Sequence, residues 1–83
     1  MSATEIKFTW EGPHARAIFL GSRFEIRRRG DGKFAFTSDR LSLLRQPMTA
    51  TNRLEAEREA FRVIRHVAKR LNDKEVLRAL GGD

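Results

Sequence analysis

Residues 23–38 read RFEIRRRGDGKFAFTS, a pattern that predicts two antiparallel strands joined by a tight turn. Phe24 and Ile26 are in phase on the first strand, and two further phenylalanines are in phase on the second. A two-residue Asp-Gly turn would set these apolar residues opposite polar ones. A three-residue turn centred on Asp31 pairs Ile26 with Phe36 and uses a glycine for the left-handed position, so we predict the longer turn.

The flanking sequence extends this hairpin into a longer antiparallel sheet. We expect strands over residues 4–10, 15–20, 23–29 and 33–38. The first two are separated by a turn that contains Gly12-Pro13, because neither residue suits a strand interior. Gly21-Ser22 has the residue order that a type II′ turn prefers. Residues 40–46 fit either a short edge strand or an apolar connector, and Pro47 ends either one.

A change in apolar spacing after the strands predicts a helix. Asn52, with Glu55 three residues later, has the spacing of a capping box, and the helix should run to about Leu71. Asn72-Asp73 then ends it, and a short second helix is expected over residues 74–80. The main apolar positions of the long helix are Leu54, Phe61, Ile64, Ala68 and Leu71, flanked by Ala56, Ala60, Val63 and Val67. They form an arc wide enough to lie across a sheet.

The sequence therefore predicts an α+β fold. We expect an antiparallel β-meander of three to five strands, packed by one long C-terminal helix with a short terminal helix after it. Residues 1–83 should form a single small basic domain, because 83 residues lie near the lower limit for one apolar core. The alternation in the first strand places Ile6, Phe8 and Trp10 in that core.

Cysteine usage and hydropathy restrict the class of protein. The chain contains no cysteine, which excludes disulfides and thiolate zinc sites. Its longest apolar run, from Ala17 to Leu20, is far shorter than the ~20 residues that cross a bilayer. The N-terminal residues contain no apolar signal core. We therefore expect a cytoplasmic protein without membrane association.

The excess positive charge is concentrated in the predicted sheet. Between His14 and Arg53 there are nine lysines and arginines against three acids, a surplus of 9 − 3 = +6 that equals the formal net charge of the chain. In the register above, Arg27 and Arg29 share the outer face with Lys33. Such a face attracts phosphate backbones or acidic protein surfaces. The candidate binding residues are Arg23, Arg27, Arg28, Arg29, Lys33, Arg40 and Arg45.

A second basic group lies on the predicted long helix, away from the core. This ridge consists of Arg58, Arg62, Arg65 and Lys69. Glu55 and Glu59 are close enough in sequence to pair with the first two members, so we expect the ridge to be mainly a solvated helix face. Glu57 falls on the apolar arc, and we expect it at the rim, paired with Arg53 or with a sheet arginine such as Arg28.

The sequence contains no constellation that indicates catalysis. His14 and His66 are the only histidines, and their spacing matches no metal-binding motif. No serine occupies a nucleophile elbow, and the Gly30-x-Gly32 pair is followed by a strand rather than by a phosphate-binding helix. We expect no enzymatic activity, no catalytic or metal-binding residues, no cofactor and no small-molecule substrate.

Three functions fit these features. The leading hypothesis is a small binding module that contacts nucleic-acid phosphates through the Arg-rich hairpin. In architecture only, a small basic sheet backed by one helix resembles the arm-type DNA-binding domains of phage integrases. Trp10 and the phenylalanines would stack on bases if one sheet face were open. The alternative is a protein-interaction module that docks on an acidic or nucleic-acid-binding protein surface. In size and style the chain resembles phage or mobile-element proteins, including inhibitors of bacterial defence complexes such as CRISPR effectors. The third is a homodimer joined through an open sheet edge or the Leu41-Leu43-Leu44 segment.

Overall fold

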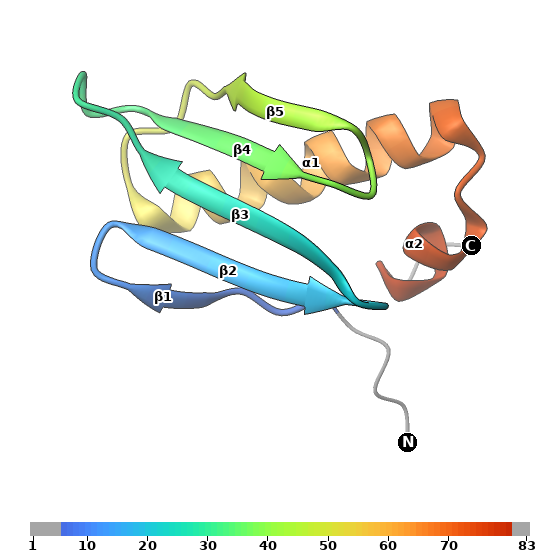
Figure 1. The fold of residues 1–83 in the computed structure, drawn as a ribbon. Coiled ribbons are helices and arrows are strands. Elements are labelled where there is room, and N and C mark those ends of the chain that lie inside the picture. The colour runs from blue at the N-terminus through green and yellow to red at the C-terminus, as the bar shows by residue number, and fades with distance from the viewer. Residues whose placement is uncertain (1–5, 81–83) are drawn as a thin grey trace.

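Five antiparallel strands form one sheet in chain order, and one long helix covers one of its faces (Figure 1). The computed structural model describes residues 6–80. Its elements are β1 (Thr9–Glu11), β2 (His14–Phe19), β3 (Ser22–Arg28), β4 (Phe34–Ser38), β5 (Leu43–Pro47), α1 (Arg53–Leu71) and α2 (Lys74–Ala79). The predicted α+β meander is confirmed, and the ambiguous segment after β4 is an edge strand. The part of the first predicted strand at residues 4 and 5 lies outside the described residues.

The β3–β4 hairpin has the predicted register. Ile26 pairs with Phe36, and Arg28 pairs with Phe34. The backbone N–H of Arg29 donates to the carbonyl of Lys33 over 2.7 Å, which closes the three-residue turn, and Gly32 adopts the left-handed conformation at φ +87°. The outward positions of both strands are therefore fixed by this turn, because a shift of one residue would exchange the two faces.

The β2–β3 turn differs from the prediction. Phe19 pairs with Ser22, so the two turn residues are Leu20 and Gly21 rather than Gly21 and Ser22. Both have positive φ, +52° and +76°, as a type I′ turn requires. The type I′ turn matches the twist of the two strands. This match outweighs the cost of placing a leucine in the left-handed region.

The helix contacts the sheet mainly through small side chains, all of which belong to the predicted apolar arc or its flanks. The fully buried positions of α1 are Ala56, Ala60, Ile64 and Ala68, at spacings of four residues. Leu54 and Leu71, placed in the core by the sequence analysis, are 58% and 54% exposed. Phe24 and Phe36 already fill the space above the sheet, so alanines on the helix allow a close approach. Phe61 lies at the side of the core, edge-on to Phe8 at 5.5 Å.

Polar residues mark both ends of α1 and the start of α2, close to the positions predicted from the sequence. The side chain of Asn52 accepts a hydrogen bond from the backbone N–H of Glu55 over 2.9 Å, and Asn72 ends α1 in the left-handed conformation. Asp73 then accepts from the N–H of Val76 and begins α2. Neither helix in residues 6–80 has the length and apolar character needed to cross a bilayer.

Candidate functional site

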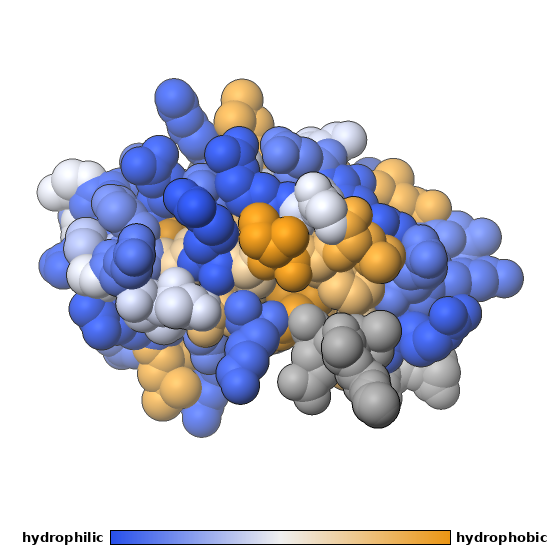
Figure 2. Space-filling model, turned by 60° about the horizontal axis from the view of Figure 1, so that its bottom comes forward, coloured by the Kyte–Doolittle hydropathy of each residue, from blue (hydrophilic) through white to orange (hydrophobic). Residues whose placement is uncertain are grey.

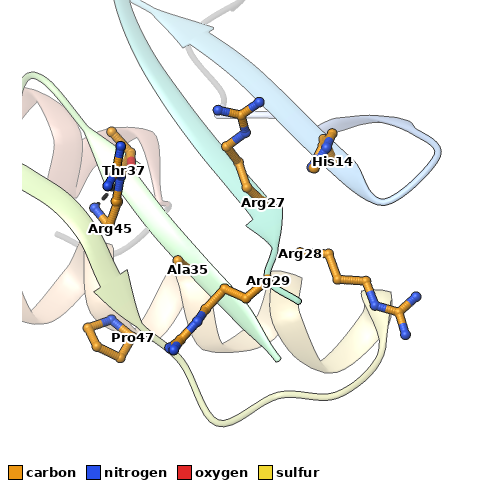
Figure 3. Close-up of a pocket in the computed structure, with 8 residues that line it drawn as sticks. All are labelled: His14, Arg27, Arg28, Arg29, Ala35, Thr37, Arg45 and Pro47. Atoms are coloured by element: carbon orange, nitrogen blue, oxygen red, sulfur yellow. Dashed lines mark hydrogen bonds between the residues drawn. The ribbon is translucent and has the colours of Figure 1, made fainter. Parts of the chain in front are cut away.

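The face of the sheet opposite α1 contains a half-open hollow of about 620 Å³, shown in Figure 3. We call it the arginine hollow. Its lining residues are His14, Arg27, Arg28, Arg29, Ala35, Thr37, Arg45 and Pro47, which include four arginines and no acid. They come from strands β2 to β5 and from the start of the β3–β4 turn. The strand alternation produces most of this face, because Ile26, Phe34 and Phe36 between the outward positions of β3 and β4 point into the core.

Arg27 lies near the middle of the arginine hollow. It pairs in register with His14 on one side and with Ala35 on the other. Its neighbour Ile26 is fully buried on the helix side, so Arg27 faces outward. Within residues 6–80, Arg27 forms no ion pair. Its side chain is exposed on the outer face.

A β-bulge in β5 places Arg45 beside Thr37, on the rim of the hollow two strands from Arg27. Ser38 pairs with Leu43 and Phe36 with Gln46, so Leu44 and Arg45 together face the single residue Thr37. Arg45 has φ +51°, and its backbone N–H donates to the Thr37 hydroxyl oxygen over 3.1 Å. The Thr37 hydroxyl oxygen thus accepts the hydrogen bond that a backbone carbonyl of the neighbouring strand would otherwise accept. Simple alternation along β5 does not predict this bulge. Arg45 was nonetheless among the binding residues predicted from the sequence.

Arg29 and Asp31 organise the turn end of the hollow. The Asp31 carboxylate accepts a hydrogen bond from the backbone N–H of Lys33 over 3.0 Å and lies 3.4 Å from the Arg29 guanidinium. The Lys33 N–H and the nearby cations hold the pKa of Asp31 below its usual value. In Figure 3 the Arg29 side chain extends toward Pro47, across the arginine hollow. Lys33 is exposed beside this turn and does not line the hollow.

The structure places the other predicted binding residues apart from this group. Arg28 borders the hollow, but its side chain extends away from Arg27 and Arg29 in Figure 3. Arg23 lies within 3.8 Å of the carboxylates of both Glu25 and Asp39. Arg16, on the same outer face, also pairs with Glu25. Acids therefore neutralise the part of the outer face that surrounds Glu25.

Arg40 is a structural residue in this fold. Its guanidinium donates to both carboxylate oxygens of Asp73, over 2.8 and 3.1 Å, and to Glu75 over 2.8 Å. These bonds join the β4–β5 turn to the start of α2. They also hold the pKa of Asp73 below its usual value. Two carboxylates thus neutralise the charge of Arg40, and its predicted role as a binding residue gains no support from its position.

The secondary ridge lies on α1, in the layer behind the sheet (Figure 1). Its four members are exposed, and Arg58 lies 3.6 Å from Glu55, as predicted. Glu59 does not pair with Arg62. It accepts hydrogen bonds from the backbone N–H groups of Thr49 and Ala50, over distances of 2.9 to 3.1 Å, and so holds the loop before α1.

The aromatic residues lie away from the arginine hollow. Trp10 donates from its indole Nε1 to Glu57 Oε2 over 3.1 Å, and the Arg53 guanidinium lies 5.5 Å from the centre of its ring. Glu57 is therefore the partner of Trp10, not of an arginine as predicted. Trp10 also meets Phe34 edge-on at 6.0 Å. The predicted stacking of bases on these rings gains no support from their positions.

The outer face changes character along β2. His14 is at one end of β2. Near the other end, the side chain of Ile18 is 61% exposed, and that of Leu20, in the turn that follows, is 54% exposed. Figure 2 shows the molecule turned so that the bottom of Figure 1 comes forward. Apolar side chains gather near the centre of this surface, and much of the surrounding surface is hydrophilic. The predicted apolar segment for self-association is divided, since Leu41 is buried whereas Leu44 is 78% exposed.

Residues 6–80 contain no group of three His, Cys, Asp or Glu side chains able to hold a metal ion. The arrangement of several positively charged guanidinium groups around one hollow favours the binding of an anion. Sequence reasoning missed His14 as a member of this group, and its position two strands from β4 follows only from the sheet register. In comparisons with known proteins, the sequence matches no family model, and no curated protein or solved structure matches the chain.

Proposed function

We propose that this protein binds nucleic-acid phosphates through the arginine hollow. The observation that carries the proposal is the gathering of Arg27, Arg29 and Arg45 around one hollow whose lining contains no acid. A guanidinium group offers a planar fork of N–H donors that fits two phosphate oxygens. A nucleic-acid backbone presents such phosphates in a regular series.

The pairing of charges elsewhere in the protein supports this assignment. Arg16 and Arg23 share Glu25, and Arg40 is held by two acids. Within residues 6–80, Arg27 and Arg45 have no such partner. Like charges close together raise the free energy of the folded state, and an anionic ligand relieves this repulsion. Two arginines without an ion-pair partner in the described residues therefore line the hollow where we propose that a ligand binds.

A protein partner is the second candidate, because Leu44 stands beside Arg45 on β5 and is 78% exposed. An apolar side chain next to a cluster of cations suits an acidic protein surface with an apolar centre. Phosphate binding does not need Leu44. The substitution Leu44→Ser should thus weaken binding to a protein partner and leave binding to nucleic acid unchanged.

The direct test is fluorescence anisotropy with labelled oligonucleotides at about 50 mM salt, where phosphate contacts are strong. The hollow variant carries Arg27→Ala with Arg45→Gly, and glycine suits the positive φ at position 45. The control variant carries Arg58→Ala with Arg62→Ala, which removes the same charge from the ridge on α1.

We expect the wild-type protein to bind with a Kd in the micromolar range, and the hollow variant to lose about tenfold or more. The control variant should lose no more than about threefold, because only the long-range field changes. Equal losses in the two variants would show that net charge, not the arginine hollow, determines binding. The absence of binding by the wild-type protein would end the proposal.

A further inference from the structure

We infer that the nucleic acid bound in the arginine hollow is double-stranded. The inference rests on the proposed function and specifies its ligand. Its basis is a separation of side chains: Arg27, Arg29 and Arg45 line the hollow on the outer face of the sheet, whereas the tryptophan and phenylalanine rings lie on the helix side or on the helix.

The positions of all the aromatic residues are known, because none falls outside residues 6–80. Five of the six phenylalanines are buried, and the sixth, Phe61, lies on α1 against Phe8. Trp10 pairs in register with buried Ala15, and its indole is held by Glu57 and covered by Arg53. Proteins that bind single strands obtain much of their affinity from bases stacked on exposed rings. Apart from the imidazole of His14, the residues that line the arginine hollow offer bases no aromatic ring.

Charge alone favours a duplex over a single strand. A duplex carries one phosphate charge for about every 1.7 Å of its axis, whereas each strand carries one for about every 3.4 Å. More counterions are therefore released for each phosphate that is neutralised on a duplex. A flexible single strand must also become ordered on the protein, and without stacking little offsets that entropy.

The scaffold of the arginine hollow suits a rigid ligand. Arg27 and Arg45 lie two strands apart, a separation of about 10 Å along the hydrogen-bonding direction of a sheet. Register and the bulge hold both backbone positions, and Ala35 of β4, only 8% exposed, lies between Arg27 and Pro47. Figure 1 shows the β3–β4 turn projecting from the end of the sheet. A two-stranded ribbon of this kind fits the major groove, while the arginine hollow meets the phosphates beside it.

The experiment is a competition assay with a labelled duplex of about 20 base pairs. The competitors are the unlabelled duplex and each of its separate strands, at equal phosphate concentrations, in DNA and RNA forms. We expect either duplex form to displace the label at about tenfold lower concentration than its strands. Fluorescence of Trp10, the only tryptophan, should not change on binding, because its ring lies on the helix side.

The possible outcomes separate the inference from the proposed function. Single strands that compete as well as the duplex, with affinity still lost in the Arg27→Ala/Arg45→Gly variant, would overturn the inference and leave the proposed function intact. Quenching of Trp10 by tightly bound single strands would also overturn it, since it would reveal stacking. Failure of every nucleic acid to bind would overturn the proposed function and the inference together.

Discussion

The indole Nε1 of Trp10 donates a hydrogen bond to Oε2 of Glu57 over 3.1 Å, and this contact joins β1 to α1. The two residues are separated by 47 positions in the chain. Arg53, four residues before Glu57, lies over the same ring at 5.5 Å. The short first strand is thus attached to the helix by one polar contact and one cation–π contact.

Glu57→Ala should lower the free energy of unfolding by about 1 to 2 kcal/mol, because the half-buried indole N–H loses its partner. Glu57→Gln keeps an acceptor oxygen and should cost less than half as much. Urea unfolding of both variants measures the difference. An alanine variant as stable as the parent protein would mean that solvent replaces the carboxylate without loss.

Asp73→Asn should make the protein about 1 kcal/mol less stable at pH 7, because the charged bond to Arg40 is lost while the cap on α2 is kept. The pKa of Asp73 lies below its usual 3.8 in the folded protein. Its contribution is therefore complete above about pH 5 and is lost as the pH falls through the lowered folded-state pKa. The stability gap between parent and variant should narrow toward pH 3. A gap of equal size at both pH values would contradict this account.

Arg45→Gly should raise the free energy of unfolding by about 0.5 kcal/mol, because glycine adopts φ +51° without strain but loses more chain entropy on folding. Arg45→Ala keeps the strained conformation and should give no such gain. Both variants should bind nucleic acid more weakly than the parent. Thermal unfolding and anisotropy on the same samples test the pair, and a destabilised glycine variant would show that the Arg45 side chain holds the bulge.

Ala60→Leu should destabilise the fold by about 1 to 3 kcal/mol, since Ala60 is fully buried against the sheet and has no space for a larger side chain. Leu54→Ala should cost less than about 0.5 kcal/mol, because Leu54 is 58% exposed. A core leucine would instead cost about 2 to 5 kcal/mol when truncated. Chemical denaturation of the two variants therefore reports which face of α1 meets the sheet.

Local sequence was sufficient to predict β2, β3 and β4, the β3–β4 register and the limits of α1, whereas residues 6–8, expected in the first strand, precede β1. Gly32 supplies the left-handed turn residue, and Asn52 and Asn72 mark the helix ends, so each signal lies within a few residues of its effect. The buried face of α1 was predicted in part: Ile64 and Ala68 are buried as expected, whereas Leu54 and Leu71 are exposed. The large phenylalanines of the sheet favour alanine opposite them, at positions such as Ala60.

The candidate site was predicted in part. Alternation correctly placed Arg27 on the outer face, but the β5 bulge beside Thr37 adds one residue and changes which side chains share that face. The partners of Arg40 are Asp73 and Glu75, 33 and 35 residues away, and no local pattern shows such contacts. Long-range pairing thus decides which cations stay available to a ligand.

The salt dependence of duplex binding tests the central claim most directly. If the arginine hollow and Lys33 neutralise about four phosphates, log affinity should fall with log salt at a slope of about −3 to −4. The Arg27→Ala/Arg45→Gly variant should reduce the magnitude of this slope by about 2, and the Arg58→Ala/Arg62→Ala variant should leave it unchanged. An identical slope for the wild-type protein and the hollow variant would contradict the claim that Arg27 and Arg45 contact phosphates.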